Sequence, residues 1–271
     1  MHRATLFLSL IAFTLAACAP PALDPAPSPT TSAETEAPAS AAPTQTLTST
    51  PAAAPTLAPP GRGVAILAPG TGSALQSPIT LQALLQPDAE RVHIELMDQS
   101  GALLYRRVLN APGLELRERI DFNVRAEGDA RLTVLIFDAF GNNSFASSVA
   151  LELLVDSNPL AADPGAVGEI IIDAPAAGAE LAGGQVAVSG QFSGPSARPL
   201  VIQLVSQAGR VLVSQEVYPG EMGADGYRPF AVDLAFNINA DSAALLAVSQ
   251  SGGAVPGIWL LNSVEVLLLA E

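Results

Sequence analysis

From Gly61 to the end of the chain, apolar side chains recur at every second position, and Gly, Pro, Asn and Asp interrupt this pattern at short intervals. Such alternation is typical of half-buried β-strands joined by turns. In one segment, for example, Leu132, Val134 and Ile136 alternate with Arg131, Thr133 and Leu135. No long stretch shows the 3.6-residue period and the caps of a helix. The sequence therefore predicts an all-β fold.

The alternating region divides into two similar halves. Pro69, Gly72 and Leu75 in the first half correspond to Pro175, Gly178 and Leu181 in the second. The segment 157–168 separates the halves and is rich in Pro, Gly and Ala. We interpret this pattern as an internal repeat, with one β domain over residues 61–156, an interdomain linker over 157–168 and a second β domain over 169–271.

The second half also resembles a known domain family. Its matching features are Ala174-Pro175, Gly178, the segment from Val186 to Gly190, and Phe230-x-Val-x-Leu-x-Phe236. These features are similar to the immunoglobulin-like domain of bacterial spore-germination proteins and envelope lipoproteins, and the first half matches more loosely. The resemblance implies two tandem immunoglobulin-like β-sandwich domains. It implies no active site, because the matching positions are turns and core residues.

The N-terminus carries a short apolar segment that ends in the chain's one cysteine. Residues 4–17 contain no charge and follow a basic start, which is typical of a signal peptide and too short for a membrane-spanning helix. The sequence Leu15-Ala16-Ala17-Cys18 resembles the lipobox of bacterial lipoproteins. The resemblance implies that residues 1–17 are a lipoprotein signal peptide and that Cys18 is lipidated. The alternative is an ordinary secretory signal that is cleaved nearby.

The next segment, residues 18–60, has a different composition. Pro, Ala, Thr and Ser make up 35 of the 42 residues from 19 to 60. A segment with so few large apolar side chains cannot offset the entropy lost on ordering, so we predict a disordered linker. We interpret it as a spacer; a ligand for proline-binding modules is the alternative, and its Ser and Thr residues permit O-glycosylation.

The charge balance excludes one class of partner. The chain has 12 basic and 26 acidic residues and a formal net charge of −14. Nucleic-acid binding depends on cationic contacts to phosphate, so we expect no nucleic-acid partner. All of the basic residues are arginine, so lysine nucleophiles and Schiff-base chemistry are excluded as well.

Few side chains are suited to catalysis or to metal binding. His93 is the one histidine beyond the signal peptide, and the alternation places it on the solvent side of a strand. We expect no enzymatic activity, no cofactor and no zinc site. The segment Asp138-Ala-Phe-Gly-Asn142-Asn143 offers up to three oxygen ligands for calcium, but the same residues are typical of a hairpin turn, which we favour.

The candidate contact surface is a loop in the second half. Tyr218 and Tyr227 flank a segment that includes Glu221 and Asp225, and the first half has no loop of this length here. Loops on rigid sandwiches carry binding function more often than strands do. Exposed aromatic side chains would also suit sugar stacking, for which Tyr105 and Trp259 are further candidates, although we favour a core position for Trp259.

Together these features predict an extracytoplasmic lipoprotein that is anchored by the lipid on Cys18. We expect the outer face of the cytoplasmic membrane or, in a two-membrane cell, the outer membrane. The expected function is that of a non-catalytic binding or envelope-assembly module for an envelope protein or polymer. The alternative is a carbohydrate-binding accessory lipoprotein.

Overall fold

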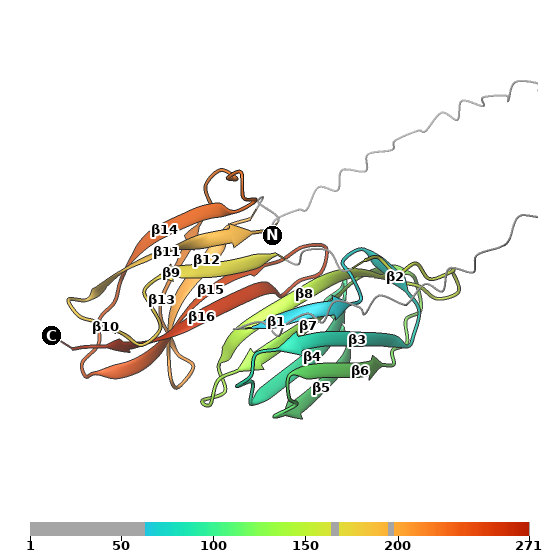
Figure 1. The fold of residues 1–271 in the computed structure, drawn as a ribbon, viewed down its shortest axis with the longest axis horizontal. Helices are drawn as coiled ribbons and strands as arrows, with labels where there is room; N and C mark the ends of the chain where they lie inside the picture. The colour runs from blue at the N-terminus through green and yellow to red at the C-terminus, as the bar shows by residue number, and fades with distance from the viewer. Residues whose placement is uncertain (1–62, 164–167, 195–197, 271) are drawn as a thin grey trace, which may run out of the picture. The chain divides into compact units, whose positions relative to one another are not determined.

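The computed structural model describes residues 63–163, 168–194 and 198–270. These residues contain sixteen strands and no helix, which confirms the predicted all-β fold (Figure 1). The signal peptide, Cys18 and the predicted linker 18–60 lie outside the described residues. Within the described ranges, no helix is long and apolar enough to cross a membrane.

The strands of the first half are β1 (Val64–Ala68), β2 (Ser73–Leu75), β3 (Ile79–Leu85), β4 (Arg91–Asp98), β5 (Leu103–Asn110), β6 (Glu115–Ile120), β7 (Gly128–Phe137) and β8 (Asn143–Leu153). Those of the second half are β9 (Glu169–Ala174), β10 (Ala179–Leu181), β11 (Gln185–Ser193), β12 (Leu200–Ser206), β13 (Val211–Val217), β14 (Arg228–Ala235), β15 (Ser242–Ser251) and β16 (Ile258–Leu268).

The two halves have the same topology. In the first, a sheet of order β1-β3-β6 packs against a sheet of order β5-β4-β7-β8, with β2 parallel to β8. In the second, β9-β11-β14 packs against β13-β12-β15-β16, with β10 parallel to β16. Gly72 and Gly178 occupy equivalent turns at positive φ, 84° and 77°, where a side chain would be strained. Each half is thus an immunoglobulin-like sandwich.

Each sandwich has its own core, built from inward-facing Val, Leu, Ile and Ala side chains. Leu81, Ile94 and Leu132 are fully buried in the first core, as are Phe192, Ile202 and Leu246 in the second. Both cores contain few aromatic side chains, in keeping with an aromatic content of 5%.

A direct strand pair joins the two sandwiches. β8 pairs antiparallel with β16, with Ala146 opposite Leu261 and Phe145 opposite Asn262, so that the larger sheets of the two halves form one ten-stranded sheet (Figure 1). Leu135, Ala146 and Leu261 form a small buried cluster at this junction. Its alternating pattern predicts that β7 is buried on one face only. Both faces are buried in the structure, because the junction also covers Arg131, Thr133 and Leu135.

Candidate functional site

The segment 218–227, which we call the β13–β14 loop, has a backbone held by its own hydrogen bonds. The Gly220 amide donates to the Pro229 carbonyl at 2.7 Å, and the Gly223 amide donates to the Tyr227 carbonyl at 2.7 Å. A tight turn closes the tip, because the Gly226 amide donates to the Gly223 carbonyl at 3.1 Å. The loop is therefore a hydrogen-bonded extension of the β13–β14 connection.

Side chains brace the same loop against strands on either side. The Arg228 guanidinium donates to the Gly220 carbonyl at 3.2 Å, and the Tyr227 hydroxyl donates to Glu169 on β9 at 2.9 Å. The Glu169 carboxylate raises the pKa of the Tyr227 phenol. At the tip, the Asp225 carboxylate accepts from the Tyr227 amide at 3.1 Å. Tyr227 and Asp225 thus serve the conformation of the loop, a role that the sequence did not indicate.

Three further side chains of the β13–β14 loop, those of Tyr218, Glu221 and Met222, extend into solvent. Tyr218 is 70% exposed and Met222 is 53% exposed, and the neighbouring Glu221 is also exposed. Tyrosine and methionine are both enriched at protein interfaces. The braced loop therefore presents two apolar side chains beside acidic ones on a fixed backbone.

The other aromatic candidates are engaged elsewhere. Trp259 on β16 is partly buried and packs against the second core. The Tyr105 hydroxyl on β5 donates to Glu118 at 2.7 Å, and burial raises the pKa of Tyr105 together with this hydrogen bond. Among the candidates for sugar stacking, Tyr218 is the one with a largely exposed ring.

The Asp138 segment forms a hairpin turn between β7 and β8. One carboxylate oxygen of Asp138 accepts from the amides of Phe140 and Asn142 at 2.9 and 2.8 Å, and the other accepts from the Asn142 side chain at 3.2 Å. Asn142 also donates to the Gln207 carbonyl of the second sandwich at 3.3 Å. No group of three or more His, Cys, Asp or Glu in the described ranges is arranged to hold a metal ion. Calcium binding by Asp138, Asn142 and Asn143 stays a hypothesis.

His93 on β4 has neighbours that do not form a catalytic arrangement. Its Nδ1 lies 3.3 Å from a guanidinium nitrogen of Arg106, and its ring lies 4.1 Å from that of Phe137 between centroids. Burial lowers the pKa of His93, and the positive charge of Arg106 lowers it further. A catalytic base of the Ser-His-Asp type is instead oriented by a carboxylate.

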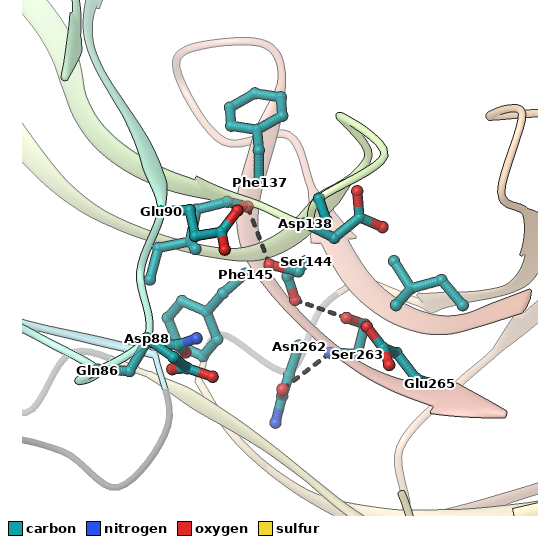
Figure 2. Close-up of a pocket in the computed structure, with 13 residues that line it drawn as sticks. Gln86, Asp88, Glu90, Phe137, Asp138, Ser144, Phe145, Asn262, Ser263 and Glu265 are labelled. Atoms are coloured by element: carbon teal, nitrogen blue, oxygen red, sulfur yellow. Dashed lines mark hydrogen bonds between the residues drawn. The ribbon is translucent and has the colours of Figure 1, made fainter. Parts of the chain in front are cut away.

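A polar crevice lies where the two sandwiches meet, with a cavity of about 240 Å³ (Figure 2). Its first-sandwich wall includes Gln86, Asp88, Glu90, Asp138 and Ser144, and its second-sandwich wall includes Asn262, Ser263 and Glu265. The Ser263 hydroxyl donates to the Ser144 carbonyl at 2.7 Å and the Ser144 hydroxyl to the Ile136 carbonyl at 3.2 Å. This crevice could not be predicted from the sequence, because it depends on the pairing of β8 with β16.

Comparisons with known proteins identify no family for this chain. No family model matches the sequence, and no curated protein matches it. Among solved structures, similarity is found to the BSP domain of a biofilm-associated protein, at 12% identity and a TM-score of 0.27, covering 74% of this chain and 29% of that one. This chain therefore spans less than a third of the length of that protein.

Two further structures are matched over more of their own length. A Porphyromonas gingivalis W83 protein of unknown function matches at 13% identity and a TM-score of 0.19, covering 76% of this chain and 98% of that one. The CFA/I adhesin CfaE of enterotoxigenic E. coli matches at 9% identity and a TM-score of 0.21, covering 75% of this chain and 81% of that one.

Proposed function

We propose that this chain is an extracytoplasmic lipoprotein, anchored through Cys18, that acts as a non-catalytic binding or envelope-assembly module. The β13–β14 loop is its contact surface, and the partner is another envelope protein or polymer. The observation that carries the proposal is the pairing of a braced backbone with the exposed Tyr218 and Met222.

The bracing favours binding for an energetic reason. A loop that is already ordered loses little conformational entropy on association, so more of the contact energy appears as affinity. Tyr218 and Met222 offer apolar area, and truncating such an interface residue typically costs more than about 1 kcal/mol at the few positions that dominate binding. Glu221 beside them favours a partner with a basic or hydrogen-bond-donating rim.

The proposal is tested with the full chain and a double substitution, Tyr218→Ala with Met222→Ala. We expect photo-crosslinking from the loop in living cells to give a discrete envelope partner, and we expect the double variant to lose that partner by at least about tenfold, or 1.4 kcal/mol. The matched control is Phe140→Ala, because Phe140 is 58% exposed but lies in the other sandwich. Equal loss in both variants, or none in either, would refute the proposal.

The alternative is glycan binding, which the exposed ring of Tyr218 keeps open. It predicts saturable binding of purified envelope glycans that is lost with Tyr218→Ala and unaffected by Met222→Ala. Binding to a protein partner predicts that both side chains contribute. The two single variants therefore distinguish these functions.

A further inference from the structure

The ten-stranded sheet has two open ends, and they differ chemically. β5 forms one end and pairs with β4, and β13 forms the other end and pairs with β12. Within the described ranges, neither strand has a pairing partner on its outer side. Such an edge is a template for another strand unless charge, proline or a covering segment protects it.

Each end strand begins with an irregularity where adjacent residues both contact the core, Leu104 with Tyr105 on β5 and Leu212 with Val213 on β13. Beyond it, the side chains alternate between the core and solvent. On β5, Tyr105 and Leu109 pack against the first core, while Arg106 is 51% exposed between them in sequence. On β13, Val213 and Val217 pack against the second core, while Glu216 is exposed. One end thus carries an outward arginine and the other an outward glutamate.

From this we propose that copies of this chain associate end to end, with β5 of one copy pairing antiparallel with β13 of the next. The register that places Arg106 opposite Glu216 also places Tyr105 opposite Val217. It pairs residues 105–110 with residues 212–217 and keeps the core-facing side chains of both strands on the same face of the extended sheet. A one-residue slip would reverse that alignment.

Charge favours this pairing over pairing between identical strands. Opposite charges in cross-strand positions stabilise a sheet and like charges destabilise it, each by about 0.2–1 kcal/mol. The two face-matched registers that pair most of β5 with a second β5 place Arg106 opposite Arg106, or Arg107 opposite Arg107. Pairing β13 with a second β13 places Glu216 opposite Leu212 and gains no ion pair.

β14, the longest edge strand of the smaller sheets, carries a residue that hinders pairing. β14 contains Pro229, which cannot donate a backbone hydrogen bond. β5 and β13 are also the two ends of the same sheet, so their pairing is heterologous and leaves a free β5 and a free β13 on every assembly. Association therefore does not close at two copies.

Sedimentation equilibrium tests this with the full chain carrying Cys18→Ser, so that lipid does not contribute to association. We expect the weight-average mass to rise with concentration and to pass the mass of two chains. Arg106→Glu and Glu216→Arg should each weaken association by about tenfold, because each substitution places two like charges opposite one another across the contact. An equimolar mixture of the two variants, and the double variant, should regain wild-type association.

Three results would overturn the proposal: a wild-type chain that stays monomeric at its highest soluble concentration, a mass that stops at two chains, or single variants that associate as wild type does. Arg106→Glu removes the ion pair with Glu95, which spans 3.2 Å. Glu216→Arg leaves that pair intact, so it tests the same contact if the β5 variant is perturbed. In this register Leu104 would lie opposite Tyr218, just beyond the paired residues 212–217. The charge-reversal variants change neither Tyr218 nor Met222, so their failure would leave the proposed function standing.

Discussion

At the scale of single residues, burial and neighbouring charge set the properties of the side chains that looked most reactive in the sequence. His93 packs against Phe137 and lies beside Arg106, and both its burial and that guanidinium lower its pKa below the ordinary value of 6.5. Glu118 occupies an inward position on β6 and is 6% exposed, where it accepts hydrogen bonds from Tyr105 and Arg107. Period-2 alternation places such a residue but does not reveal its partners.

The lowered pKa of His93 makes stability depend on pH. Because the unfolded chain takes up this proton near pH 6.5 and the folded chain takes it up only at lower pH, the free energy of unfolding falls as pH drops through that window. We expect the free energy of unfolding, measured in urea melts, to fall more for the wild type than for His93→Gln as pH is lowered from about 8 to about 5. A difference between the two proteins that does not change with pH would contradict this.

At the scale of elements, one buried arginine fixes a loop of the second sandwich to a strand of the first. Arg131 on β7 is 2% exposed and donates to the carbonyls of Val255 and Gly257 at 3.1 Å each. It also donates to the Pro256 carbonyl. Burial lowers the pKa of Arg131, and the negative charge of Glu95 opposes that shift. The two terminal nitrogens of Arg131 are thus satisfied by carbonyls of residues 252–257, the β15–β16 loop, whereas its buried Nε has no hydrogen-bond partner.

Replacing Arg131 by Met should destabilise the chain, because the carbonyls of the β15–β16 loop lose their donor. We expect the free energy of unfolding to fall by about 2–4 kcal/mol in chemical denaturation. The control is Arg117→Met on β6, an exposed position where the change should stay within about 0.5 kcal/mol. Equal stability of the two variants would show that the Arg131 contacts contribute nothing.

The sequence predicted the elements better than it predicted their junctions. Alternation and turn residues locate the strands and the repeat, because both depend on neighbouring residues. The pairing of Ala146 with Leu261 could not be predicted, because either strand reads as an ordinary edge of its own sandwich. The β13–β14 loop was predicted from its length and composition, but its bracing by Glu169 depends on a contact 58 residues away in sequence.

At the scale of the whole molecule, the two paired sandwiches follow the proposed lipid anchor in the chain. We propose that Cys18 carries the lipid and that residues 19–60 connect it to the sandwiches. Two or more acyl chains are needed for stable anchoring, which a diacylglyceryl thioether provides. Binding through the β13–β14 loop and end-to-end pairing of sheets would then both take place at a membrane surface.

The most direct test is intact-mass spectrometry of the protein recovered from membranes after expression of the full chain in a bacterium. We expect a chain that begins at Cys18 and carries a diacylglyceryl group, with or without a further acyl group on its amine. Cys18→Ser should abolish that species and leave the protein unprocessed or soluble. A wild-type chain that is cleaved elsewhere, or that starts near Cys18 without lipid, would contradict lipid attachment at Cys18.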